Sequence, residues 1–175
     1  ETNPGTISAA GLASLRQAGV NRISIGVQSL EDGLLRTLGR IHNAAQAVDT
    51  VLMARQAGFN NINIDLIYGI PGQSLAAWQK TLQGVLELAP EHISAYSLQL
   101  EEGTPLEQAV KHGAIEACPE DDDLAMYREV INTLTGNGYS HYEISNFAKP
   151  GYECVHNLVY WLNGSYLGLG PGAHS

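Results

Sequence analysis

Four polar side chains stand at or just after the predicted ends of strands, where parallel α/β folds place their active sites. They are Glu1, Gln28, Asp65 and Gln99. Asp65 is the most informative of them, because it interrupts an otherwise apolar stretch and a buried carboxylate is costly unless something pairs with it. Each residue alone could cap the loop or helix that follows it. Together at one rim, they favour a ligand site.

Arg40 follows a short predicted helix, in the segment Leu38–His42. Its guanidinium could simply be solvated at the surface. Beside the acidic and amide groups of the predicted rim, however, it would suit a ligand carboxylate, which a guanidinium binds through two parallel hydrogen bonds.

A second group of candidates lies near the end of the chain and consists of His156, Tyr160 and Trp161. Neutral imidazole is a common ligand of metals and heme, and aromatic rings can pack against a macrocycle. The alternative is a hydrogen-bonded histidine beside two aromatic core residues. His174, in a glycine-rich run, is a further histidine of the same kind.

The two cysteines do not form a recognisable metal or disulfide motif. Cys118 and Cys154 are too far apart in sequence for a CxxC pair and too few for a disulfide framework. The acidic run at residues 119–123 opens a predicted helix, where acidic side chains suit the positive helix N-terminus. We therefore predict no metal site within the chain.

Alternating helices and strands must position these residues. Apolar periodicity and stop residues predict helices over residues 7–18, 31–38, 43–57, 74–88, 122–136 and near 153–161. Short apolar runs predict strands over residues 21–27, 61–68, 92–98 and 140–146. This alternation is typical of parallel βαβ units, and between residues 101 and 123 we expect an irregular polar segment.

Composition narrows the class of protein. Hydrophobic residues make up 44% of the 175 residues, which is too many for a disordered chain, and no apolar run is long enough for a membrane helix. The net charge of −9 argues against a nucleic-acid binder. Few cysteines indicate a reducing, cytoplasmic setting. The first residue is Glu and the last residues stop within a motif, so we expect a portion of a longer chain.

Four motifs resemble, in order and spacing, those of radical S-adenosylmethionine (SAM) proteins of the HemN/HemW type. This family contains oxygen-independent coproporphyrinogen III oxidase and a related heme chaperone. The motifs are Glu1–Thr6, Arg22–Ser29, Leu38–His42 and Asn63–Gln73.

Three later stretches resemble the heme-chaperone (HemW) type more than the oxidase. They are Tyr142–Gly151, His156–Trp161 and Gly168–His174.

The resemblance implies an α/β fold, a partial (β/α) TIM-like radical SAM barrel of which this chain holds the later strands and helices. Residues 1–100 would be the C-terminal portion of the barrel, beginning at the end of its third strand. Residues 101–175 would be a linker, a helix and the start of a C-terminal α/β extension.

The resemblance also implies roles for the rim residues. Glu1 would hold the ribose hydroxyls of SAM, and Gln28 and Asp65 would complete a polar ring. Arg40 would meet the methionine carboxylate, and Gln99 would lie close by. His156 would contact heme, with Tyr160 and Trp161 as packing surface.

The implied cofactors are SAM, heme and a 4Fe–4S cluster, whose CxxxCxxC ligands this chain lacks. In the family, the reduced cluster cleaves SAM to a 5′-deoxyadenosyl radical. Without a cluster we expect this chain alone to be inactive, and we assign no catalytic residue.

Three functions stay open. The first is a heme chaperone that binds heme and SAM and delivers heme to a respiratory protein. The second is an oxidase that decarboxylates coproporphyrinogen III to protoporphyrinogen IX. The third is a degenerate α/β binding domain without a cluster.

Overall fold

The computed structural model describes residues 1–168, in which the strands form one mixed five-stranded sheet. The strand order is β1-β2-β3-β5-β4, with β1, β2 and β3 parallel and β5 antiparallel to both β3 and β4. The strands are β1 (Ile23–Gln28), β2 (Ile62–Tyr68), β3 (His92–Ser97), β4 (Ser140–His141) and β5 (Asn146–Ala148). The parallel βαβ units predicted from the sequence are confirmed.

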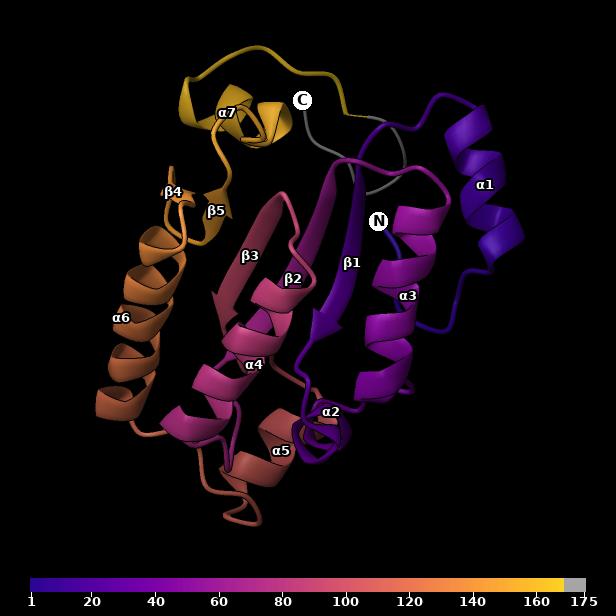
Figure 1. Cartoon of the computed structure of the whole chain (residues 1–175). Helices are drawn as coiled ribbons and strands as arrows, with labels where there is room; N and C mark the ends of the chain where they lie inside the picture. Colours follow the sequence, from indigo (N-terminus) through magenta and orange to yellow (C-terminus); the bar gives the residue numbers. More distant parts are fainter. Residues whose placement is uncertain (169–175) are drawn as a thin grey trace.

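Helices α3, α4 and α6 cover one face of this sheet (Figure 1). The helices of the described chain are α1 (Ala9–Gln17), α2 (Asp32–Thr37), α3 (Ala44–Gln56), α4 (Leu75–Glu87), α5 (Pro105–Lys111), α6 (Glu120–Gly136) and α7 (Val155–Trp161). Side-chain caps fix several of their starts, including the predicted cap at Ser74, which accepts from the Ala77 N–H. Asn43 and Gln46 form a reciprocal capping box at α3.

Two predictions about the second half of the chain are wrong. The predicted strand over residues 140–146 is instead two short antiparallel strands, β4 and β5, joined by a turn. The segment predicted to be irregular contains α5, whose signals are Thr104 as the capping residue and Pro105 at the first helical position. The acidic run does open α6, as predicted, from Glu120 onward.

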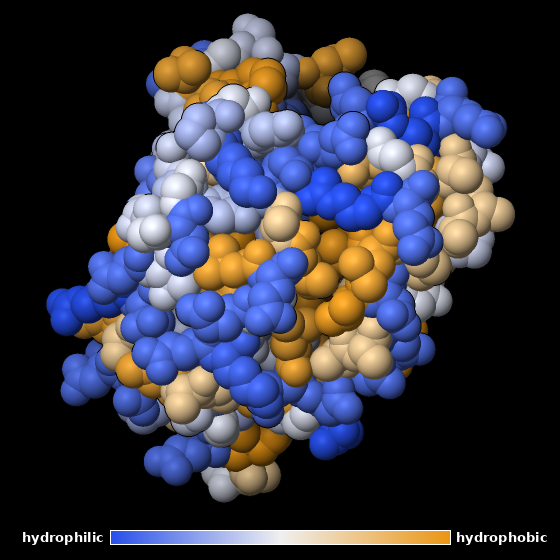
Figure 2. Space-filling model, viewed as in Figure 1, coloured by the Kyte–Doolittle hydropathy of each residue, from blue (hydrophilic) through white to orange (hydrophobic). Residues whose placement is uncertain are grey.

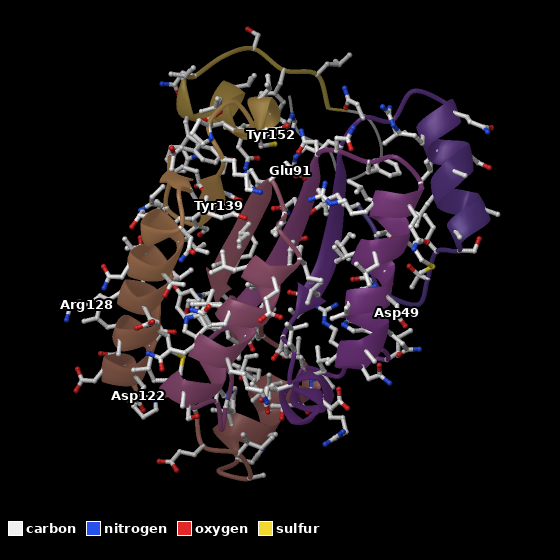
Figure 3. All side chains as sticks on the ribbon, viewed as in Figure 1. Asp49, Glu91, Asp122, Arg128, Tyr139 and Tyr152 are labelled. Atoms are coloured by element: carbon white, nitrogen blue, oxygen red, sulfur yellow. The ribbon has the colours of Figure 1, made fainter. Side chains whose placement is uncertain are left out.

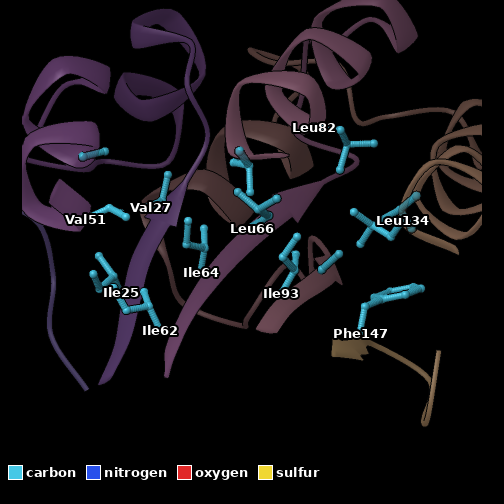
Figure 4. Close-up of a cluster of buried hydrophobic side chains, with 14 of the residues drawn as sticks. Ile25, Val27, Val51, Ile62, Ile64, Leu66, Leu82, Ile93, Leu134 and Phe147 are labelled. Carbon is cyan, nitrogen blue, oxygen red and sulfur yellow. The ribbon is translucent and has the colours of Figure 1, made fainter. Parts of the chain in front are cut away.

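Strand residues alternate between two environments. On one face, Ile25, Ile64 and Ile93 are fully buried against α3, α4 and α6, which contribute residues such as Val51, Leu82 and Leu134 to the same core (Figure 4). The intervening strand residues point to the opposite, inner face, and most of them are polar. Burial of the apolar set therefore fixes which residues reach the inner face.

The beginnings of β2 and β3 are held together by Glu91, at the start of β3 (Figure 3). Its carboxylate forms an ion pair with Arg55 of α3 at 2.8 Å and accepts from the Ile62 N–H at 3.0 Å. Nearby, the Tyr139 hydroxyl donates to the Pro90 carbonyl at 2.6 Å. These contacts fix the register in which the inner-face residues of the two strands meet.

The two ends of the sheet carry different elements. Helices α2 and α5 lie at the end toward which the parallel strands run, and α7 lies at the end where they begin (Figure 1). Hydrophobic side chains gather over α7 (Figure 2), where Val155, Trp161 and Leu162 are more than half exposed. None of the described helices has the length and hydrophobicity needed to span a membrane.

We predict that Phe147→Ala destabilises the chain by about 3–5 kcal/mol, because Phe147 of β5 is fully buried in the core and stacks on His141 of β4. Urea unfolding followed by circular dichroism measures this change. The matched control is Tyr152→Ala, at an aromatic residue that is 36% exposed, and a similar loss in both variants would contradict the assignment.

Candidate functional site

The inner face of the sheet carries a band of polar side chains contributed by β1, β2, β3 and β5. In the strand register, Ser24 pairs with Asn63 and Asn63 with His92, while Asp65 pairs with Ser94 and Ser94 with Asn146. The full set is Ser24, Gln28, Asn63, Asp65, His92, Ser94, Tyr96 and Asn146. A band of this kind requires either internal hydrogen bonds or a ligand.

All five rim residues predicted from the sequence line one pocket of about 500 Å³ on this face. They are Glu1, Gln28, Arg40, Asp65 and Gln99. Ile67, Tyr96, Ser97 and Leu98 complete the lining, so an apolar wall faces the charged groups. A mixed lining with a few convergent polar groups is typical of sites for small organic ligands.

Gln28 reaches the pocket through an unusual backbone conformation. It is the last residue of β1, its φ is +67°, and the pairing of β1 with β2 shifts between Ile25 and Gln28. Its side chain folds back over Gly26, where an added Cβ would lie 2.8 Å from Gln28 Nε2 and 2.7 Å from Asn3 Oδ1. Strain of this sort is found at functional sites, and glycine at position 26 makes room for it.

Arg40 is held beside Gln28 by its own loop. Gly39, at φ +68°, ends α2, and the Arg40 N–H donates to the Leu35 carbonyl at 2.9 Å. Two residues on, buried His42 bonds through Nε2 to the Val27 carbonyl at 3.2 Å. Within the described chain, the buried Nε of Arg40 has no hydrogen-bond partner. A ligand carboxylate would supply one.

Asp65 lies in the middle of β2, not at the end of a strand as the sequence suggested. Its carboxylate accepts from Ser24 Oγ at 2.8 Å and from Asn63 Nδ2 at 2.7 Å. Burial raises the pKa of Asp65, hydrogen bonds from Ser24, Asn63 and Ser94 oppose that rise, and the negative charge of Glu1 adds to it. A carboxylate accepts about four hydrogen bonds, so capacity remains for a ligand that donates.

His92 is the most strongly perturbed imidazole on the inner face. It is fully buried, its Nδ1 lies 2.5 Å from Asn63 Oδ1, and its Nε2 lies 2.7 Å from the Tyr142 hydroxyl. Burial, with the positive charge of Arg22, lowers the pKa of His92 to about 3. The ring is therefore neutral at physiological pH.

The second predicted group lies on α7, at the end of the sheet where the parallel strands begin, and lines none of the 500 Å³ pocket (Figure 1). His156 lines a smaller polar pocket of about 180 Å³ that also includes Glu1 and Asp65. Its Nε2 is 3.1 Å from the Tyr160 hydroxyl. Tyr160 and Trp161 are 45% and 54% exposed, so these aromatics do not fill a core. His174 and most of the glycine-rich run lie outside the described residues.

Sequence reasoning missed most of the inner-face band. It identified Gln28 and Asp65 but not Asn63, His92 or Tyr96, which lie on the same face. The signal was present as alternate polar residues, Asn63 and Asp65 in β2 and His92, Ser94 and Tyr96 in β3, but apolar neighbours concealed it.

Metal ligands are sparse in the part of the chain that the structure describes. No group of three or more His, Cys, Asp or Glu residues is arranged to hold an ion. Cys118 and Cys154 are both free thiols. The residues present therefore do not fit a 4Fe–4S cluster, which is held by thiolates.

Residues 1–84 match the family model of the radical SAM superfamily. Over 173 residues the chain is 42% identical to the heme chaperone HemW of Lactococcus lactis, covering 99% of this chain and 46% of that protein. It is 43% identical over 174 residues to bovine radical S-adenosyl methionine domain-containing protein 1, mitochondrial, covering 99% of this chain and 39% of that one. The chain thus spans a little under half the length of these relatives.

Among solved structures, the coproporphyrinogen III oxidase HemN of Escherichia coli is similar with a TM-score of 0.76 at 31% identity. The similarity covers 87% of this chain and 35% of that one. The predicted fold, a part of a radical SAM barrel, is confirmed by this match.

We predict that the neutral state of His92 makes stability fall on acidification. A histidine whose pKa is depressed in the folded state stabilises that state fully above its unfolded pKa of 6.5, and loses this contribution as pH falls toward 3. Between pH 7 and pH 5 the loss is about 2 kcal/mol.

The measurement is the free energy of unfolding of wild type and His92→Gln at both pH values. Gln does not titrate, so the variant should start less stable but lose about 2 kcal/mol less over this interval. Equal pH dependence of the two proteins would contradict the buried neutral imidazole.

Proposed function

Because residues 1–84 match the radical SAM family model and the chain is similar to HemW over nearly its whole length, we propose that its inner-face pocket binds SAM within the barrel of a HemW-type heme chaperone. The observation that carries the proposal is the convergence of Glu1, Gln28, Arg40, Asp65 and Gln99 on one pocket. In the whole protein, SAM bound here would supply radical chemistry. The residues of this chain bind, orient and shield the cofactor.

The chemistry of the pocket fits the two ends of SAM. Arg40, with its unpartnered buried Nε, supplies a cation for the methionine carboxylate. The carboxylates of Glu1 and Asp65 accept from the ribose hydroxyls, and Asp65 is preoriented for this by Ser24 and Asn63. Ile67 and Leu98 supply the apolar surface that excludes water.

This chain does not supply the cluster. Its cysteines lack the required number and spacing, so cluster ligands would come from the part of the whole protein that the chain does not span. We assign residues 1–100 to the barrel and residues 101–175 to a linker, α6 and the start of the C-terminal region. We place the protein in a reducing compartment, the cytoplasm in a bacterial cell.

Heme is the proposed cargo, and its contact is proposed on α7. His156 is exposed, and Tyr160 and Trp161 beside it offer half-exposed aromatic surface for the macrocycle. The pocket beside His156, at about 180 Å³, is too small to enclose a macrocycle, so heme would lie on the outer surface of α7. The acceptor would be a heme-requiring respiratory protein.

The similarity to the HemN structure supports a second candidate, decarboxylation of coproporphyrinogen III. The names of the more similar relatives favour the chaperone. If the whole protein formed a decarboxylated product under reducing conditions, the oxidase would be favoured over the chaperone.

We predict that Arg40→Ala in the whole protein weakens SAM binding roughly ten- to hundredfold, the range expected for loss of a charged hydrogen bond. Binding of adenosine, which lacks the carboxylate, should be unchanged. Isothermal titration calorimetry measures both ligands.

The matched control is Arg36→Ala, at an exposed arginine in the last turn of α2 outside the pocket lining. It should leave the affinity for SAM unchanged. If Arg40→Ala weakens SAM and adenosine equally, Arg40 shapes the pocket without binding the carboxylate.

We predict that His156→Ala lowers heme affinity about tenfold or more and shifts the heme absorbance maximum, because the imidazole that would contact heme is lost. Titration of the whole protein with heme measures both effects. His112→Ala, at an exposed histidine after α5, is the control and should change neither. Unchanged affinity and absorbance in His156→Ala would remove His156 from the heme site.

A further inference from the structure

An unbroken line of side-chain hydrogen bonds joins α7 to the Asp65 carboxylate across the inner face. Tyr142, in the turn before β5, lies 2.7 Å from His92 Nε2, and His92 Nδ1 lies 2.5 Å from Asn63 Oδ1. Asn63 Nδ2 then donates to Asp65 Oδ1 at 2.7 Å. Three bonds therefore connect Tyr142 to the pocket.

The donor and the acceptor of each hydrogen bond in this line can be assigned from the neighbouring groups. Asn63 Nδ2 uses its two hydrogens on Ser24 Oγ, at 2.6 Å, and on Asp65 Oδ1. A flipped amide would set its oxygen against the carboxylate, so Asn63 Oδ1 must face His92. His92 Nδ1 therefore carries the hydrogen, and Nε2 of the neutral ring accepts from the Tyr142 hydroxyl.

The oxygen of Tyr142 is fixed to the first turn of α7. It accepts from the Cys154 N–H at 3.3 Å and from Asn157 Nδ2 at 3.4 Å. Cys154 is the residue that precedes α7, and within the described chain no residue of α7 is fully buried. Since α7 has little packing of its own, these two bonds help to hold it on the sheet.

All donors in the line point toward Asp65. The order runs from the first turn of α7 through Tyr142, His92 and Asn63 to the carboxylate. Displacement of α7 would remove both hydrogen bonds that the Tyr142 oxygen accepts. The hydroxyl would then be less firmly held against His92 Nε2, and through His92 the Asn63 amide that orients Asp65 would be less firmly held as well. Conversely, a ligand that reorients the Asp65 carboxylate would change the contacts of α7 through the same hydrogen bonds.

We infer that Tyr142 is a positioning residue that links the seating of α7 to the orientation of the Asp65 carboxylate, so that SAM binding and heme binding influence each other. This inference rests on the proposed function. If SAM changes the affinity for heme by some factor, heme must change the affinity for SAM by the same factor. A purely structural tyrosine would affect both affinities without changing that factor.

The test uses the whole protein without reductant and measures the dissociation constant of heme with and without saturating SAM. We expect the wild type to show a ratio of at least about fivefold, the lower end of typical coupling. Tyr142→Phe removes the hydroxyl and should bring the ratio close to one. The control Tyr152→Phe, at an aromatic residue between β5 and α7 (Figure 3), should keep the wild-type ratio.

A second variant guards against misfolding of Tyr142→Phe. Asn157→Ala removes one bond from α7 to Tyr142 and leaves the bond to His92, so it should lower the ratio partway. A wild-type ratio of one, or a Tyr142→Phe ratio equal to that of wild type, overturns the inference while the proposed function stands. Failure of the wild type to bind SAM or heme at all would instead overturn the proposed function.

Discussion

Burial of the Asp65 carboxylate is the constraint on which the inner face depends. Moving an ionised carboxylate out of water costs several kcal/mol unless hydrogen bonds and charges compensate. Ser24 and Asn63 supply two of those bonds, and Asn63 can do so only because His92 and Ser94 occupy its oxygen. A polar band of this kind is stable only when its members satisfy one another, so each strand register is specified by its neighbours as well as by the apolar core.

The pocket is formed where this ordered band meets irregular backbone. Gln28 ends β1 with a positive φ and Arg40 follows the glycine after α2, so both side chains stand where regular structure stops. The His42 bond to Val27 and the absence of a side chain at Gly26 fix both residues in place. The strained backbone of Gln28 can persist because the strands on either side hold it in this geometry.

The helices and strands up to Ser97 could be predicted because apolar periodicity, glycine stops and caps agreed along that part of the chain. The hairpin of β4 and β5 could not, because its turn at residues 142–145 contains neither Gly nor Pro. Asp65 could be recognised as a site residue because it interrupts an apolar run. His92, which reaches Asp65 through Asn63, could not, since this relation depends on the register between β2 and β3, which the sequence does not display. Arg40 was a rim candidate because a guanidinium suits a ligand carboxylate beside acidic and amide groups, whereas the methionine carboxylate as its partner came only from the resemblance to a family.

The proposed SAM pocket and the proposed heme surface on α7 are separate, and the polar band of the inner face lies between them. The rim pocket includes the ends of β1 and β3, whereas α7 lies where the parallel strands begin. A ligand on the outer surface of α7 would not touch Arg40, so the two sites can communicate only through the protein or through the smaller pocket that both Asp65 and His156 line. Close-packed interiors transmit strain, and hydrogen bonds in a line strengthen one another. Asn63 and His92 thus have two roles. They stabilise the buried Asp65 carboxylate, and through Tyr142 they connect it to α7.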